Sequence, residues 1–404
     1  MSVTSKRSPS EIKTRVNRNG KRVPAGRPRT PVIGLEAEFT VYVQDEKCLP
    51  EHVFRSPRYL VRQAIIPRTG RSVHLPSGGA LYFDTGVIEV ATPIIELEDG
   101  CCIRAVRSLW EQIEFVRKEL DAWETAHNCI IRLEGFSTHY NISIPQHASV
   151  NMWELARVLT YLLHPPVMLL ATNRLSTGVG VRPRGNRLEV TVDFTPDPAL
   201  MVATTTALVA IIQQVLEWPE ISMAELRRRE FPIIEGFKPC KHTSRKGFLA
   251  RYNCFPRNPF AADPNTADWK VEDGRTLSLR QIAWEITKPF RGPMRKLSDP
   301  TVVRHILAVL CGRARSLLDF PDRPRKYEDA GRVIDWNRRQ MRRLPRSRYE
   351  QVIRRVITHK PIQVGASTYR AERMHGWYEV IFRNTRTGHR RVFNLDELVK
   401  HCAA

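Results

Sequence analysis

Four stretches in the first half of the chain alternate between apolar and polar residues. They cover residues 31–43, 81–91, 135–144 and 187–194, and the second turns back on itself around Gly86. Because successive side chains of a β-strand point to opposite faces, each stretch predicts strands with one apolar and one polar face. Strands with such an apolar face are expected to lie in a sheet that is covered on that side.

The polar faces gather side chains that can hold cations or phosphate. These side chains are Glu36, Glu38, Asp84, Glu89, His139, Asn141, Ser143, Arg187, Glu189, Thr191 and Asp193. A Glu-x-Glu spacing puts two carboxylates about 7 Å apart on one strand face, which suits a divalent cation held by oxygen ligands. For any single strand, a solvated polar face is the simple alternative. Four such faces together predict a curved sheet whose concave side is an active-site funnel.

Helices are predicted between and after these strands. Apolar residues recur with helical spacing over 102–127. Asn151 is placed to cap the next helix, and Pro165–Pro166 is expected to end it. Asp197 caps a further helix, 199–217. The order of strands and helices predicts an α+β fold, a curved antiparallel sheet with helices packed on its outer face.

A glycine-containing loop at 173–186 presents three arginines, Arg174, Arg182 and Arg184. A guanidinium group matches two phosphate oxygens at once, so the loop is a candidate phosphate-binding segment. A solvated basic loop is an equal alternative for this segment taken alone.

The composition adds an excess of positive charge. The 404 residues carry a formal net charge of +22, with 64 Lys and Arg against 42 Asp and Glu. This charge indicates an acidic partner, which would be nucleic acid, an acidic protein, or a nucleotide and carboxylate substrate. Solubility alone is the alternative explanation.

Several classes of protein are disfavoured by the sequence. The eight cysteines show no C-x-x-C pair and no metal-finger spacing, so a reduced, cytoplasmic protein is expected. No apolar run approaches the roughly 18 to 20 residues of a membrane span, and the N-terminus lacks the apolar part of a secretory signal. The sequence also has no Walker loop, no His-Glu-x-x-His helix and no Gly-x-Ser-x-Gly elbow.

Three segments are expected along the chain. Residues 1–30 form a basic arm with few apolar side chains, which is expected to be disordered and able to contact nucleic acid without specificity. Residues 31–345 hold the strands and helices of the main domain. Residues 346–404 form a small basic C-terminal module, with a hairpin around 384–388.

Taken together, these motifs are similar to those of the glutamine synthetase-like carboxylate–amine ligases. The motifs are the stretches Gly34–Phe39, Gly79–Asp84, Glu89–Pro93, His139–Asn141 and Arg187–Glu189. Within that superfamily the chain most resembles the ligase of the prokaryotic ubiquitin-like protein Pup and its sister, the Pup deamidase or depupylase. The resemblance is clearest over residues 31–217. It implies that ATP and Mg²⁺ bind in the funnel of the sheet.

The resemblance also implies roles for individual residues. The metal ligands would be Glu36, Glu38, Glu89, His139 and Glu189. Asn141 and the three arginines of the candidate phosphate-binding loop, Arg174, Arg182 and Arg184, are assigned as nucleotide ligands. Asp84 would be the catalytic aspartate, which deprotonates the incoming amine in ligases or acts on the amide in the deamidase. Arg187 matches the arginine of the wider superfamily and is assigned to catalysis.

The activity that this resemblance implies is an ATP- and Mg²⁺-dependent ligation, in which an amine displaces phosphate from an acyl-phosphate to form an amide or isopeptide bond. The donor would be a carboxylate, such as that of a small acidic protein modifier, and the acceptor an amine such as a protein lysine. The short interval between Glu38 and Gly78 has no room for the depupylase insertion and favours ligation. The alternatives are an amide or isopeptide hydrolase on the same fold, and a basic nucleic-acid-binding protein with an inactive ligase fold.

Overall fold

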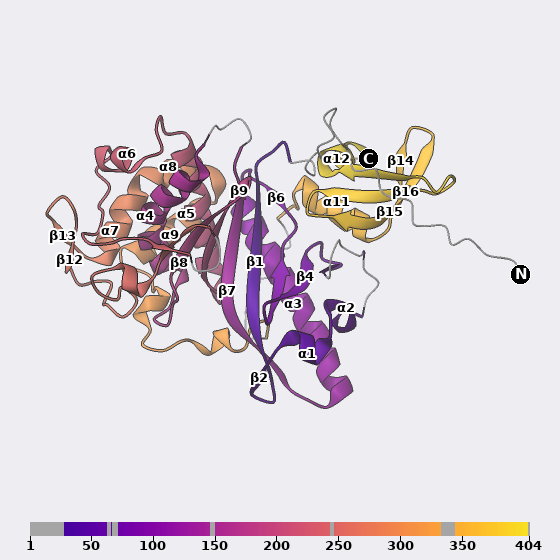
Figure 1. Cartoon of the computed structure of the whole chain (residues 1–404), viewed down its shortest axis with the longest axis horizontal. Coiled ribbons are helices and arrows are strands. Elements are labelled where there is room, and N and C mark those ends of the chain that lie inside the picture. The colour runs from indigo at the N-terminus through magenta and orange to yellow at the C-terminus, as the bar shows by residue number, and fades with distance from the viewer. Residues whose placement is uncertain are drawn as a thin grey trace, which may run out of the picture.

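The structure is a computed structural model that describes residues 28–62, 66, 72–145, 150–242, 246–332 and 344–402. Nearly all of the basic arm expected at 1–30 lies outside these residues. Figure 1 shows a large mixed body and, beside it, a smaller C-terminal module drawn in yellow.

The body is organised around one large antiparallel sheet (Figure 1). Its strands lie in the order β10 (Cys240–Lys241), β11 (Phe248–Ala250), β8 (Val179–Arg184), β9 (Arg187–Asp193), β7 (Ile131–Ser143), β1 (Val32–Val43), β5 (Val87–Ala91), β4 (Ala80–Asp84) and β3 (Val73–His74). Two short strands, β2 (Glu46–Cys48) and β6 (Ile95–Glu96), also pair with β1. All four predicted alternating stretches lie in this sheet, so the prediction from the period-two pattern is confirmed.

Three long helices cover the apolar face of the sheet. They are α3 (Cys101–His127), α4 (Met152–Ala171) and α5 (Pro198–Leu216). Helix α3 packs on β1 and β5, α4 packs on β8, and both helices contact α5. The buried side chains of these helices and strands belong to one continuous apolar core. Burial of this face is the main stabilising term of the fold.

Helix α4 corrects one prediction. Its cap is as expected, because the side chain of Asn151 accepts hydrogen bonds from the backbone N–H groups of Trp153 and Glu154. The helix does not end at Pro165–Pro166 but continues to Ala171. Proline removes backbone hydrogen bonds, yet its fixed φ is compatible with a helix. Since both prolines are buried in the core, tertiary packing outweighs the missing bonds.

Helix α5 corrects a second expectation. Among the described residues it is the one helix long and apolar enough to cross a membrane, although 78% of its most apolar window is buried inside the protein. Three consecutive threonines, Thr204–Thr206, interrupt the apolar run in the sequence, but they do not lower the mean hydropathy enough to exclude a span. The burial is that of a core helix in contact with α3 and α4.

Shorter elements complete the body. The helices are α1 (Pro50–Phe54), α2 (Pro57–Leu60), α6 (Met223–Arg228), α7 (Leu279–Thr287), α8 (Arg291–Leu297) and α9 (Pro300–Leu310), with a small hairpin of β12 (Trp269–Lys270) and β13 (Thr276–Leu277). Within the described ranges, single turns of 3-10 helix lie at η1 (Tyr252–Cys254), η2 (Lys288–Phe290), η3 (Leu317–Asp319) and η4 (Arg325–Tyr327).

The C-terminal module has a core of its own. It consists of α11 (Arg348–Ile357), the antiparallel sheet β14 (Ile362–Val364), β15 (Ser367–His375), β16 (Glu379–Asn384) and β17 (Arg390–Asn394), and α12 (Leu395–Cys402). Its buried residues form a second apolar cluster, which also takes in Val32 and Ile66 of the body. The hairpin predicted around 384–388 is confirmed as the turn between β16 and β17. The fold class is thus the predicted one, an α+β sheet with helices on one face and a small C-terminal unit.

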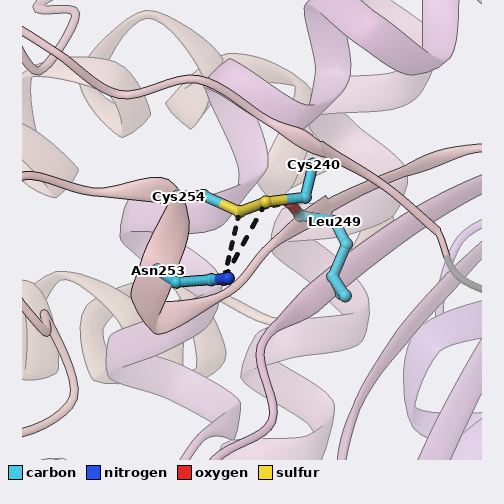
Figure 2. Close-up of a disulfide and its surroundings, with 4 residues drawn as sticks. All are labelled: Cys240, Leu249, Asn253 and Cys254. Atoms are coloured by element: carbon cyan, nitrogen blue, oxygen red, sulfur yellow. Dashed lines mark hydrogen bonds between the residues drawn. A yellow bond between two sulfur atoms is a disulfide. The ribbon is translucent and has the colours of Figure 1, made fainter.

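One pair of cysteines is bonded. Cys240 in β10 and Cys254 in η1 form a disulfide, with their Cα atoms 6.1 Å apart, beside the side chain of Asn253 (Figure 2). The expectation that all cysteines are reduced is therefore wrong for this pair. The bond ties the edge strand β10 to the chain that follows β11.

Candidate functional site

The strand register brings the predicted polar residues together on one side of the main sheet, which we call the polar face. Glu36 of β1 lies opposite His139 of β7, and Glu38 lies opposite Ser137 of β7 on one side and Glu89 of β5 on the other. These pairings follow directly from period-two alternation in antiparallel strands. Glu36 and Asn141, which touch across the strands, are 105 residues apart in the sequence, so the site exists only in the folded sheet.

Two overlapping groups of potential cation ligands occupy the middle of the polar face. One group is Glu36, Glu89 and His139; the other is Glu38, Asp84 and Glu89; within each group the ligand atoms lie within 4.8 Å of one another. Glu89 belongs to both groups. We call the five residues the carboxylate cluster. Among the described residues, these are the groups of His, Cys, Asp and Glu close enough to hold a metal ion.

Hydrogen bonds fix the orientation of the cluster. Tyr82 donates from its hydroxyl to Glu89 Oε1 at 2.5 Å, and Ser137 donates to Glu38 Oε2 at 2.6 Å. Asn141 Nδ2 donates to Glu36 Oε2 at 3.1 Å. His139 lies between the carboxylates, with Nδ1 at 3.5 Å from Glu36. Supporting groups of this kind hold metal ligands in position.

The carboxylates of the cluster differ in their affinity for protons. Burial and the negative charge of Glu36 raise the pKa of Glu89 to about 9. Burial also opposes ionisation of Glu36, but the hydrogen bond and charge of His139, together with the charge of Arg187 and the hydrogen bond from Asn141, outweigh it and lower that pKa to about 2. Two carboxylates so close cannot both ionise freely, so the pair holds one proton near neutral pH, mainly on Glu89.

Arginines occupy one end of the polar face, on strands β8 and β9. Glu189 of β9 lies opposite Arg182 of β8 and forms a close ion pair with it, and Arg184 Nε approaches Glu189 Oε2 at 2.7 Å. Arg187 donates from Nε to Asn141 Oδ1 at 2.7 Å. Asn141 therefore links the arginines to Glu36 of the carboxylate cluster.

These contacts place each predicted site residue. Arg182 and Arg184 lie on strand β8 rather than in a loop, which corrects the predicted loop at 173–186. Glu189 is engaged by two guanidinium groups and stands outside both groups of cation ligands. Its assignment as a metal ligand stays a prediction, one that this geometry disfavours.

Arg174 is the predicted nucleotide ligand that lies apart. Its guanidinium donates to the backbone oxygens of Phe320 and Ala261, at 3.0 and 3.2 Å. Neither of these oxygens belongs to a residue of the polar face. The observed contacts are those of an arginine that holds two loops together.

A bulge in β7 brings an aromatic ring to the site that the sequence did not suggest. The register passes from Glu38 opposite Ser137 to Phe39 opposite Gly135, which leaves Phe136 as the extra residue. Phe136 is 54% exposed. The apolar face at this point is filled by the buried ring of Phe194, against which Gly135 packs. The half-exposed ring of Phe136, next in sequence to Ser137, is therefore a candidate border of the polar face.

The donor set fits a divalent cation such as Mg²⁺. Hard cations prefer carboxylate oxygens, and the cluster offers four carboxylates with one imidazole and a hydrogen-bonded surround. A cation there would replace the proton on Glu89 and relieve the repulsion among the acids. The residues present thus match the cation that the sequence motifs imply.

The fold and the polar face define a class of proteins. The chain has a Pup-ligase-like fold, which confirms at this level the resemblance drawn from its motifs. The similarity is to a solved complex of the prokaryotic ubiquitin-like protein Pup and its ligase PafA, with a TM-score of 0.53, 11% identity and 92% of each chain covered. A structure of the ligase PafA with ADP gives a TM-score of 0.49 at 11% identity, covering 87% of this chain and 92% of that one. No protein-family model and no curated protein matches the sequence.

Proposed function

We propose that the protein is an ATP- and Mg²⁺-dependent carboxylate–amine ligase that forms an amide or isopeptide bond through an acyl-phosphate. The observation that supports this most is the division of the polar face, with a carboxylate cluster in the middle and arginines at one end. Phosphoryl transfer needs cation-binding oxygens and guanidinium groups side by side. The fold shared with a Pup ligase supports the same activity.

In this proposal, side chains from different strands have different roles. Glu36, Glu38, Glu89 and His139 hold the cation, which when bound supplies positive charge against the phosphates. Arg187 and the neighbouring Arg182 and Arg184 orient the nucleotide phosphates, with Asn141 fixing the position of Arg187. Their planar guanidinium groups suit phosphate oxygens better than a lysine would.

The proposed reaction has two steps. A carboxylate oxygen of the donor attacks the γ-phosphorus of ATP, and ADP leaves, so that an acyl-phosphate forms. An amine then attacks the acyl carbon, Asp84 takes a proton from that amine, and phosphate leaves. Asp84 is suited to this role because it lies at the edge of the carboxylate cluster, on the half-exposed end of β4.

The partners follow from charge and from analogy. A net charge of +22 favours an acidic donor. The similar solved complex contains Pup, a small ubiquitin-like protein, bound to its ligase. We therefore propose a small acidic protein modifier as donor and a protein lysine as acceptor, in the cytoplasm.

The test is ATP binding and turnover in the full chain with Mg²⁺, comparing wild type with Glu36→Gln and Asp84→Asn. Glu36→Gln should weaken Mg²⁺-dependent ATP binding by about 10- to 100-fold, the range seen when groups that support a metal site are removed. Asp84→Asn should retain binding and lose amine-dependent ADP release. Glu51→Gln, in the exposed first turn of α1, is a matched control with the same loss of charge.

Three outcomes would contradict the proposal. Wild type that binds no ATP in the presence of Mg²⁺ would exclude both the ligase and the hydrolase. Amide cleavage without net ATP consumption would instead identify the hydrolase on the same fold. Equal effects of Glu51→Gln and Glu36→Gln would show that ATP binding depends on overall charge rather than on the carboxylate cluster.

A further inference from the structure

Three arginines stand side by side across the sheet of the C-terminal module. Arg370 of β15 lies directly opposite Arg383 of β16, and Arg383 lies directly opposite Arg390 of β17. All three residues are exposed. We call them the arginine row.

The arginine row lies on the side of the sheet that faces away from the core of the module. Phe382 and Phe393, which neighbour Arg383 and Val392 along their strands, belong to that core. Alternation along the strands therefore points Arg383 and Val392 to the opposite side. Val392 is 41% exposed there, in line with this assignment.

The fold gains nothing from such a row. Side chains directly opposite on antiparallel strands have Cβ atoms about 5 Å apart, and like charges at that spacing are destabilising. Glu372 offsets part of the repulsion, because it accepts hydrogen bonds from Arg390 Nε at 2.8 Å and from Arg383 Nη2 at 3.2 Å. Arg370 has no carboxylate within ion-pair distance among the described residues. The row thus keeps a surplus of positive charge on a rigid surface.

We propose that the arginine row binds the sugar–phosphate backbone of nucleic acid. Neighbouring strands lie about 4.8 Å apart, so the row spans roughly 10 Å and can follow consecutive phosphates. Guanidinium groups bind phosphate through two parallel hydrogen bonds, and each arginine of the row keeps N–H groups that Glu372 does not use.

Two features favour nucleic acid over an acidic protein as the partner. Protein interfaces have an apolar, fully buried centre, whereas Val392 is the one exposed large apolar side chain among the described residues of this module. Contacts to a phosphate backbone need no such centre. Since the described part of the module also shows no exposed aromatic ring to stack on bases, the contact is expected to be independent of base sequence.

The charge of the whole module agrees with this partner. Residues 344–402 contain twelve Lys and Arg against five Asp and Glu. The proposed surface is separate from the carboxylate cluster, so it would add a nucleic-acid contact to whatever reaction the body performs. It does not depend on the ligase assignment.

The experiment measures binding of the full chain to a fluorescein-labelled duplex DNA of mixed sequence, by fluorescence anisotropy over a salt series. The triple variant Arg370→Gln, Arg383→Gln and Arg390→Gln should reduce the slope of log K against log salt by about 2.7, or about 0.9 for each phosphate that is no longer neutralised. The single variant Arg370→Gln breaks no ion pair between residues that the structure describes, so it should fold normally and reduce the slope by about 0.9.

A matched control removes the same charge elsewhere. Arg227 and Arg275 are exposed and Arg157 is partly exposed; all three lie in the body and each is paired with an acidic side chain. Their triple change to Gln should leave the slope nearly unchanged. Wild type that binds no DNA would overturn the proposal. So would equal reductions of the slope in the control and row variants, or row-dependent binding of poly-glutamate as tight as that of DNA, which would indicate an acidic protein instead.

Discussion

The assignment of Glu36, Glu89 and His139 as cation ligands can be tested most directly by measuring proton release when a cation binds. Burial and the charge of Glu36 raise the pKa of Glu89 to about 9, so Glu89 carries a proton at neutral pH when no cation is bound. A cation held by Glu36, Glu89 and His139 must displace that proton, since metal ligands bind in their deprotonated form. Cation affinity is therefore predicted to depend on pH through Glu89.

The size of the pH dependence of Mg²⁺ affinity follows from the pKa of Glu89. At pH 7, about two units below it, only about 1% of Glu89 is ionised, so the apparent affinity for Mg²⁺ is about 100-fold weaker than for the ionised site. Between about pH 7 and pH 9 the affinity should rise about tenfold per pH unit, with about one proton released per cation bound. Above about pH 9 the affinity should stop rising, and the number of protons released per cation should fall toward zero. A carboxylate with a lowered pKa would show the same rise in affinity, but it would be complete well below pH 7.

The assay is isothermal titration calorimetry with MgCl₂ in buffers of different ionisation enthalpy, which counts the protons released. Glu89→Gln is the matched variant, because it keeps an oxygen that can accept the hydrogen bond from Tyr82 but has no proton to lose. Its cation binding should be weak and independent of pH. Wild type that binds Mg²⁺ without releasing a proton would refute the electrostatic argument, and proton release that persists in Glu89→Gln would assign it to another group.

Two further predictions concern the β7 bulge and its surroundings. Gly135→Ala would put a Cβ atom 2.2 Å from Phe194, so it should destabilise the protein by about 1–3 kcal/mol in urea denaturation. The control Gly292→Ala lies in helix α8, has no atom within 4 Å of the added Cβ, and should instead stabilise the protein by about 0.5–1 kcal/mol. Equal effects of the two substitutions on stability would show that Gly135 has no packing role. On the ligase proposal, Phe136→Ala should raise KM for a lysine-like amine about fivefold, as expected from losing about 1 kcal/mol of apolar contact, while ATP binding stays unchanged; an unchanged KM in an active enzyme would exclude the ring from the acceptor site.

Much of the sheet could be predicted from the sequence because its strands obey period-two alternation. Strand β8 could not, since Gly180 and Pro183 break the apolar pattern and its arginines are typical of a solvated loop. Its place is fixed by pairing with β9, which is a tertiary contact. The continuation of α4 through Pro165–Pro166 was missed for the same reason, because the packing that holds it comes from distant elements.

The candidate site shows the same limit at the level of single residues. Glu36 and Glu189 look alike in the sequence, each on the polar side of an alternating strand. Both lie close to Nδ1 of His139, at 3.5 Å for Glu36 and 3.6 Å for Glu189. Glu189 differs because it also forms ion pairs with Arg182 and Arg184, whereas Glu36 lies beside Glu89. A carboxylate between two guanidinium groups is already neutralised, while one beside an imidazole and a protonated acid remains available to a cation. The role of each acid is therefore determined by what lies across the strand, and strand order is set by the whole fold.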